Sequence, residues 1–86
     1  MITLYTTPNC PRCRALKKWL EQRGIDFVER NLSDPKVMTD LIMRDVYVFT
    51  APLLEVNGRL YSERELFENS GSLKEEFLKA VLKEVA

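Results

Sequence analysis

Histidine is absent from this 86-residue chain. Without an imidazole, Ser-His and Cys-His nucleophile systems are excluded, and so is every metal site that uses histidine ligands. An excess of charge of either sign is also missing, because 13 Lys and Arg residues balance 13 Asp and Glu residues. Bulk charge therefore gives no reason to expect nucleic acid as a partner.

Long hydrophobic runs are missing too. No segment approaches the roughly 20 apolar residues that a membrane-spanning helix needs. The segment Met1 to Thr3 leads directly into an apolar strand, not into the charged region and apolar core of a signal peptide. We therefore expect a cytoplasmic protein with no membrane partner. The length predicts a single domain over residues 1–86, and we expect a monomer.

Cysteine occurs only twice, as Cys10 and Cys13, at the junction between an apolar strand and an amphipathic helix. In a reducing cytosol, thiols stay free unless they are transient, catalytic or metal-bound. A zinc site normally needs four ligands, so two cysteines without histidine would require dimerisation or carboxylates. Cys-x-x-Cys beside a βαβ pattern instead predicts a dithiol redox site without a metal. A static bridge and a half zinc site are the alternatives.

The position of the cysteine pair predicts its chemistry. Cys10 is expected at the cap of a helix, where unpaired backbone N–H groups and the positive end of the helix dipole stabilise a thiolate. Pro11 loses no hydrogen bond at the first helical position, and Arg12 adds a cation next to the sulfur. We therefore predict that the pKa of Cys10 is depressed. Cys13 is expected one turn deeper, with a more buried sulfur.

Periodicity and turn residues predict eight elements along the chain. Strands are expected at 2–6, 27–32, 51–56 and 59–61, and helices at 11–23, 35–44, 62–68 and 73–85. Asn57-Gly58 is the strongest hairpin signal, because both turn positions need a positive φ. The order of elements predicts an α/β fold with a mixed four-stranded sheet flanked by helices on both faces.

The helices are predicted in more detail from their apolar stripes and caps. Buried stripes are expected at Leu16, Trp19 and Leu20, at Val37, Leu41 and Ile42, and at Leu73, Phe77, Ala80 or Val81, and Val85. Capping boxes are expected at residues 62–65 and 72–75. Arg14 and Lys17 add positive charge within two turns of the cysteines. Tyr47, Val48 and Phe49 are too apolar to be left in water.

Three motifs together resemble the glutaredoxin branch of the thioredoxin superfamily. They are Cys10-Pro11-Arg12-Cys13 after the first strand, Thr50-Ala51-Pro52 before the third, and the Asn57-Gly58 hairpin. The resemblance implies a thioredoxin-like fold, with Cys10 as the exposed nucleophile and Cys13 as the resolving thiol. It also implies that Pro52 is a cis proline lying against the pair. Glutaredoxins commonly carry Cys-Pro-Tyr-Cys and Thr-Val-Pro at these places, and this chain departs from each in one residue.

The resemblance also indicates where a substrate would bind. A cis bond at Pro52 would point the Ala51 N–H and C=O toward an extended segment of substrate, with Thr50 flanking the site. Glutaredoxins that use glutathione usually carry Gly-Gly followed by Asp where this chain has Ser62-Glu63. That helix start still offers N–H donors for a carboxylate, but Glu63 puts a negative charge where the carboxylate of glutathione would lie.

These expectations favour a thiol:disulfide oxidoreductase that reduces protein disulfides without a tightly bound cofactor. Ser62 is similar to the serine of the glutaredoxin-like hydrogen donors of ribonucleotide reductase, which take electrons from thioredoxin reductase. Either glutathione or thioredoxin reductase is therefore expected as the electron donor. The alternatives are a glutathione-coupled glutaredoxin, a dimer that bridges an iron–sulfur cluster, and a non-catalytic binding module that uses the Pro52 edge.

Overall fold

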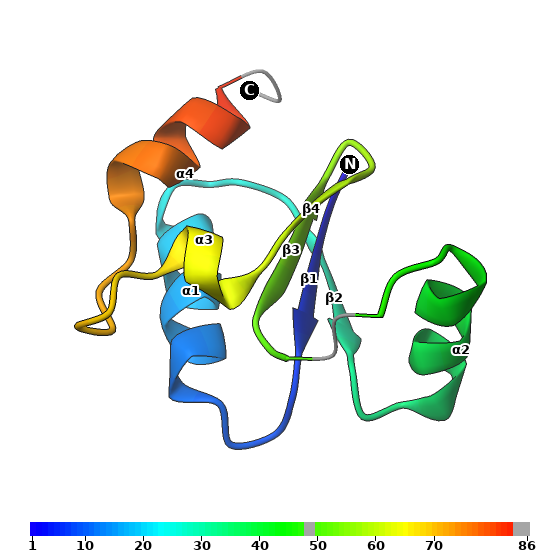
Figure 1. Ribbon diagram of the computed structural model, residues 1–86. Helices are drawn as coiled ribbons and strands as arrows, with labels where there is room; N and C mark the ends of the chain where they lie inside the picture. Colours follow the sequence, from blue (N-terminus) through cyan, green and yellow to red (C-terminus); the bar gives the residue numbers. More distant parts are fainter. Residues whose placement is uncertain (48–49, 84–86) are drawn as a thin grey trace.

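Four strands form one mixed sheet in the order β2-β1-β3-β4 (Figure 1). The computed structural model describes residues 1–47 and 50–83. The strand β1 (Ile2–Thr6) is parallel to β2 (Val28–Asn31) and antiparallel to β3 (Leu53–Val56), which pairs with β4 (Arg59–Tyr61). All five residues of β1 are buried. This strand is therefore the central one that the sequence predicted.

Helices lie on both faces of the sheet (Figure 1). On one face lie α1 (Pro11–Gln22), α3 (Glu63–Leu66) and α4 (Glu75–Leu82), and on the other lies α2 (Pro35–Met43). The predicted α/β class, the parallel βαβ unit and the mixed four-stranded sheet are confirmed.

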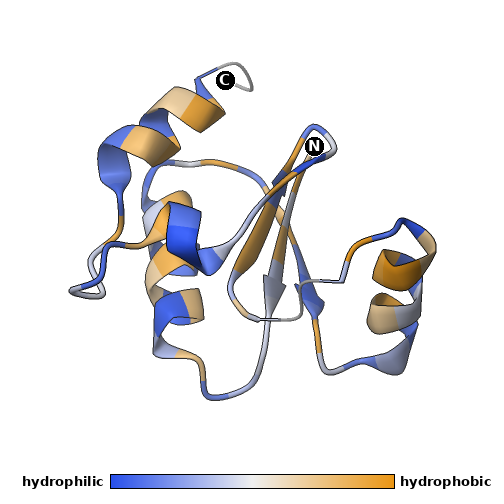
Figure 2. Cartoon of the chain, in the orientation of Figure 1, coloured by the Kyte–Doolittle hydropathy of each residue, from blue (hydrophilic) through white to orange (hydrophobic). Residues whose placement is uncertain are grey.

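The alternation of side chains along β1 divides the hydrophobic core in two. Ile2 and Leu4 point to the face of α1, whereas Tyr5 points to the face of α2. The larger core is formed by Ile2, Leu4, Leu16, Trp19, Leu20, Leu54, Val56, Leu66, Phe67, Leu78 and Leu82. The smaller core is formed by Tyr5, Leu32, Val37, Leu41 and Leu53. Hydrophobic and hydrophilic residues follow one another along the helices (Figure 2), as expected of helices with one buried face.

The structure confirms four of the predicted helix ends, caps and turns. The first helix ends just before Gly24, which has φ +65°, and the hairpin turn has φ +51° at Asn57 and +85° at Gly58. The side chain of Asp34 caps α2 by accepting from the Lys36 N–H at 2.9 Å. In the capping box at the start of α3, the Glu65 carboxylate accepts from the N–H of Ser62 at 3.2 Å.

The predicted capping box at residues 72–75 is wrong, and α4 starts at Glu75 with Lys74 as its cap. Before that point the chain makes a turn, in which the N–H of Glu68 donates to the carbonyl of Ser72 at 2.8 Å. The helical hydrogen bonds begin only with the Lys74 carbonyl, which accepts from the N–H of Leu78 at 3.0 Å. This turn also ends α3 at Leu66, before the predicted residue 68.

The buried stripe of α4 is displaced from the predicted one. Leu78 and Leu82 are the buried residues of the helix, Phe77 and Val81 are half-buried, and Ala80 is exposed. Residues four apart share one helix face, so the pair at 78 and 82 defines the face that packs on α1. Leu73 packs against the core from the preceding turn, and the predicted contact of residue 85 lies outside the described residues.

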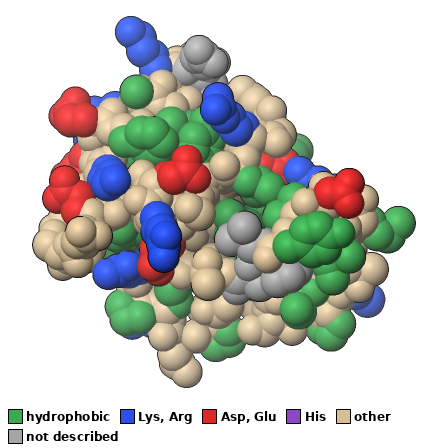
Figure 3. Space-filling view, viewed as in Figure 1, with side chains coloured by type: hydrophobic (Ala, Val, Ile, Leu, Met, Phe, Trp, Pro, Cys, Tyr) green, Lys and Arg blue, Asp and Glu red, His purple; other side chains and the backbone are tan. Residues whose placement is uncertain are grey.

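Two predicted core residues near α2 are exposed. Ile42 is 44% exposed because Val37 and Leu41, four residues apart, already form the face that meets the sheet. Tyr47 is 66% exposed, and its hydroxyl donates to the carboxylate of Asp45 at 3.5 Å. Hydrophobic side chains accordingly gather on the surface over α2 (Figure 3). The expected burial of residues 48 and 49 lies outside the described residues.

Candidate active site

The cysteine motif lies where β1 gives way to α1. Cys10 is the cap of the helix, with extended backbone at φ −110° and ψ 101°, and its sulfur accepts a hydrogen bond from the Cys13 N–H at 3.1 Å. Pro11 is the first helical residue, where a missing N–H breaks no helical hydrogen bond. The helix therefore begins at the residue that the sequence predicted, with a backbone donor aimed at the sulfur.

The structure holds the site in its oxidised state, with a disulfide between Cys10 and Cys13. The two residues differ in accessibility. Cys13 is 3% exposed and lies on the same buried stripe of α1 as Leu16 and Trp19, whereas Cys10 is half-buried. The expectation that Cys13 is the more buried of the two residues is confirmed.

A cavity of 190 Å³ adjoins the two sulfurs and is lined by Thr6, Thr7, Asn9, Cys10, Cys13, Arg14, Lys17 and Glu29. Across it, Lys17 Nζ lies 2.8 Å from Glu29 Oε1, and the Thr6 hydroxyl donates to Glu29 Oε2 at 3.0 Å. The hydrogen bond with Lys17 lowers the pKa of Glu29, and the same bond raises the pKa of Lys17. The positive charge of Lys17 beside the sulfurs is therefore balanced by a carboxylate.

Sequence reasoning missed Glu29. The residue lies on β2 and pairs in register with Leu4, so it reaches the active site only through the parallel pairing of β1 with β2. The predicted strand at 27–32 contains the residue, but a strand boundary does not give its register. The buried residues of β1 were the one signal that could have indicated the register of β2, and that register places Glu29 beside the cysteines.

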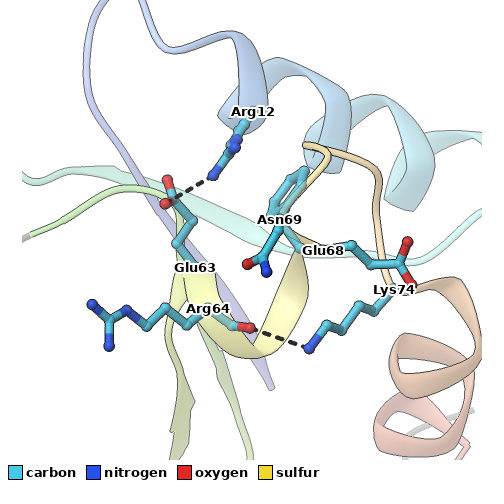
Figure 4. Close-up of a pocket in the computed structure, with 7 residues that line it drawn as sticks. Arg12, Glu63, Arg64, Glu68, Asn69 and Lys74 are labelled. Atoms are coloured by element: carbon cyan, nitrogen blue, oxygen red, sulfur yellow. Dashed lines mark hydrogen bonds and ion pairs between the residues drawn. The ribbon is translucent and has the colours of Figure 1, made fainter.

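Arg12 is directed toward α3. Its Nη1 lies 2.9 Å from Glu63 Oε1, and its guanidinium lies 5.5 Å from the centre of the Phe67 ring (Figure 4). The structure thus brings together two predicted site residues, Arg12 and Glu63, in an ion pair. The predicted role of Arg12 in stabilising the Cys10 thiolate stays a prediction.

The ion pair lies at the edge of a second cavity, of 660 Å³, between α1 and α3. Its lining residues are Arg12, Glu63, Arg64, Phe67, Glu68, Asn69 and Lys74. The Lys74 ammonium donates to the Arg64 carbonyl at 3.4 Å across this cavity (Figure 4). All of these lining residues except Phe67 are polar or charged, so the cavity is polar.

The residues predicted to bind substrate lie on two segments. The Ala51–Pro52 bond is cis, as the family resemblance implied. Pro52 is buried, Ala51 is half-buried against the smaller core, and Thr50 is exposed. Ser62 is the cap of α3 and Glu63 its first residue. Contact of a substrate with these residues stays a prediction.

Two further findings concern the described residues only. Within residues 1–47 and 50–83, no group of three or more Cys, Asp or Glu side chains is arranged so that it could hold a metal ion. The helices in the same part of the chain are too short or too polar to span a membrane.

Two curated proteins that resemble the chain in sequence are named global transcriptional regulators. The chain is 35% identical over 66 residues to the global transcriptional regulator Spx 1 of Bacillus cereus, a match that covers 73% of this chain and 50% of the regulator. It is 48% identical over 42 residues to Spx of Bacillus subtilis, covering 49% of this chain and 32% of the regulator. The chain spans about half the length of the first of these curated relatives.

Solved structures that resemble the chain are thioredoxin-like. The thioredoxin-like protein BC3987 superposes with a TM-score of 0.69 at 23% identity, covering 95% of this chain and all of the other. The glutaredoxin-like NrdH-redoxin of Escherichia coli gives a TM-score of 0.57 at 26% identity, covering 71% of this chain and 79% of the other. The fold is therefore thioredoxin-like. A family model described as Glutaredoxin matches residues 2–61, and the chain belongs to the glutaredoxin family.

Proposed function

We propose that the chain is a cytoplasmic thiol:disulfide oxidoreductase that reduces protein disulfides by cycling between the Cys10/Cys13 dithiol and disulfide. The observation that carries the proposal is the pair itself. The sulfur of the half-buried Cys10, at a helix cap, accepts a hydrogen bond from a backbone N–H and is bonded to the sulfur of the buried Cys13 one turn away. A sulfur held in this way is stabilised as a thiolate, the form that attacks disulfides.

The cycle follows from exchange chemistry. The Cys10 thiolate attacks one sulfur of the target disulfide, so that a mixed disulfide forms and the other target sulfur leaves as a thiolate. Cys13 then loses its proton and attacks Cys10, which releases the second target thiolate. The target gains two electrons, and the protein is left with the disulfide seen in the structure.

Reduction of insulin disulfides tests this proposal. We expect the wild-type protein to reduce insulin and the Cys10→Ser variant to be inactive, because the attacking sulfur is lost. The Cys13→Ser variant should accumulate a covalent mixed disulfide with its target, visible by mass spectrometry and cleared by dithiothreitol. Equal activity of Cys10→Ser and wild type, or a Cys13→Ser variant that traps nothing, would contradict the assigned order of attack.

We further propose that the electron donor is thioredoxin reductase, with weaker coupling to glutathione, and that no cofactor is tightly bound. Support comes from Glu63 at the start of α3 and from the likeness to NrdH-redoxin, a glutaredoxin-like protein with a thioredoxin-like activity profile. NADPH-linked turnover with thioredoxin reductase, compared with glutathione plus glutathione reductase, tests the choice. Faster turnover with glutathione would overturn the donor and leave the dithiol cycle intact.

A second candidate function is favoured by the relatives. Proteins named global transcriptional regulators match 73% of this chain at 35% identity, so a redox-sensitive binding module is the alternative to an enzyme. In that case the cysteines would be oxidised and reduced without turning over a substrate. Catalytic turnover in the insulin assay supports the enzyme, whereas a single stoichiometric oxidation with no turnover supports the module.

A further inference from the structure

Two basic side chains in the first two turns of α1 are each paired with an acidic residue from another element. Arg12 pairs with Glu63 of α3 at 2.9 Å, and Lys17 pairs with Glu29 of β2 at 2.8 Å. Arg12 stands between the two cysteines, and Lys17 lines the cavity beside them. The acidic partners therefore neutralise most of the positive charge that the motif would otherwise present around Cys10.

Both pairs are held by additional contacts. The Arg12 guanidinium faces the Phe67 ring at 5.5 Å, which fixes it on the side of α3 (Figure 4). The second oxygen of Glu29 accepts from the Thr6 hydroxyl at 3.0 Å, and Thr6 is only 8% exposed. Each pair thus has a further contact beyond the ion pair itself, with Phe67 in one case and with Thr6 in the other.

The two pairs lie in different cavities. Glu63 stands on the side of the polar cavity between α1 and α3, and Glu29 stands in the cavity lined by both sulfurs and by Arg14. A disulfide that approaches Cys10 therefore meets two balanced pairs and the charge of Arg14. Without the two carboxylates, it would meet three basic side chains.

We propose that Glu63 and Glu29 are specificity-determining residues, which remove the attraction for disulfides of negatively charged thiols and so favour disulfides flanked by neutral or basic groups. The inference rests on the proposed oxidoreductase function and names the substrate class of that site. Its physical basis is the Coulomb energy between the substrate and the nearby side chains, which depends on the net charge within several ångströms. Glu63 and Glu29 affect the approach and binding of the substrate disulfide. The cysteines alone carry out the thiol–disulfide exchange.

A series of small disulfides of different charge tests this proposal in one half-reaction. Pre-reduced protein is mixed with oxidised glutathione, which is anionic, with bis(2-hydroxyethyl) disulfide, which is neutral, or with cystamine, which is cationic. In each case Cys10 attacks, one thiolate leaves, and Cys13 releases the second thiolate, so no external reductant is needed. Acid quenching and chromatography of the released thiol give the rate constant.

The measured quantity is the ratio of the rate constant for oxidised glutathione to that for cystamine. We expect this ratio to rise roughly three- to tenfold in Glu63→Gln and in Glu29→Gln at low salt, and the increase to shrink at high salt. A change in the reactivity of Cys10 itself affects all three disulfides alike and cancels in the ratio. Arg12→Met should lower the ratio, because it leaves the charge of Glu63 unbalanced.

Glu76→Gln is the matched control, because Glu76 pairs with Lys79 at 3.5 Å on α4 and is 93% exposed. It should leave the ratio within twofold of the wild-type value. The inference is overturned if Glu63→Gln and Glu29→Gln keep the wild-type ratio, or if Glu76→Gln raises it as much as they do. A wild-type protein that exchanges with none of the three disulfides and also fails to reduce insulin would instead overturn the proposed function.

Discussion

The two faces of the sheet are held to their helices in different ways. On the face of α1, α3 and α4, eleven buried side chains form a continuous apolar core, while five form the core under α2, counted over the described residues. The face of α2, with its smaller apolar core, also has a polar contact between buried and half-buried side chains. The Tyr5 hydroxyl, on a side chain only 1% exposed, donates to Glu55 at 3.1 Å, and Arg44 binds the same carboxylate at 3.0 Å.

This difference explains where the redox site lies. Cys13 belongs to the same buried stripe as Leu16 and Leu20, so the position of its sulfur is fixed by the larger core. The smaller face carries an exposed Ile42 and Tyr47 and has less apolar area to hold a helix in place. A site that needs two sulfurs held one turn apart is therefore built on the face with the deeper packing.

The largest expected effect comes from removing one leucine from each face. Leu16→Ala should destabilise the protein by about 3–5 kcal/mol and Leu41→Ala by about 2–3 kcal/mol, because the site under α2 is nearer to solvent and can relax. Both side chains are fully buried in the wild type, which makes the comparison matched. Urea unfolding of the oxidised protein, followed by circular dichroism, measures both. An equal or larger loss for Leu41→Ala would contradict the ranking of the two faces.

A smaller effect is expected from the polar contact under α2. Tyr5→Phe should cost about 1 kcal/mol near neutral pH, since the hydrogen bond to Glu55 and the longer one from Arg44 at 3.5 Å are lost while Glu55 keeps its bond to Arg44. Burial, followed by the charge of Glu55, raises the pKa of Tyr5. Folded protein then resists deprotonation of this tyrosine more than unfolded protein does.

The contribution of Tyr5 is consequently complete below the unfolded pKa of about 10 and is lost as pH rises toward the folded pKa. We expect the stability of the wild type to fall above pH 10 more steeply than that of Tyr5→Phe. Urea midpoints of the oxidised protein between pH 8 and pH 11 measure the difference. Parallel curves for the two proteins would show that Tyr5 does not carry this dependence.

Signals between residues close in sequence were sufficient to predict several features of the structure. The cap at Cys10, the hairpin at Asn57-Gly58 and the strand at 2–6 all follow from short-range chemistry, and all are confirmed. The buried stripe of α1 follows from helical spacing for the same reason. These features place the cysteines without any knowledge of the rest of the chain.

Long-range pairing could not be predicted in this way. Glu29 reaches the sulfurs through the register of two parallel strands, and Glu63 reaches Arg12 across more than fifty residues of chain. The sequence identified Arg12 and Glu63 separately but gave no reason for them to meet. The face of α4 was missed for a different reason, because the turn just before Lys74 decides where that helix begins.

The smallest expected effect concerns Glu29, whose pairing differs from the buried contacts above because both side chains are about two-fifths exposed. Glu29→Gln should lower the midpoint temperature by only about 1–2 °C at pH 7. The hydrogen bond with Lys17 lowers the pKa of Glu29, so its contribution is present above the unfolded pKa of about 4.3 and is lost as pH falls through the folded pKa.

The difference between wild type and Glu29→Gln should therefore vanish in acid, since both side chains are then uncharged. Thermal unfolding at pH 7 and pH 3, with Glu76→Gln as the exposed control, measures this. If the difference persists unchanged at pH 3, Glu29 acts through its shape and its bond to Thr6 and not through its charge.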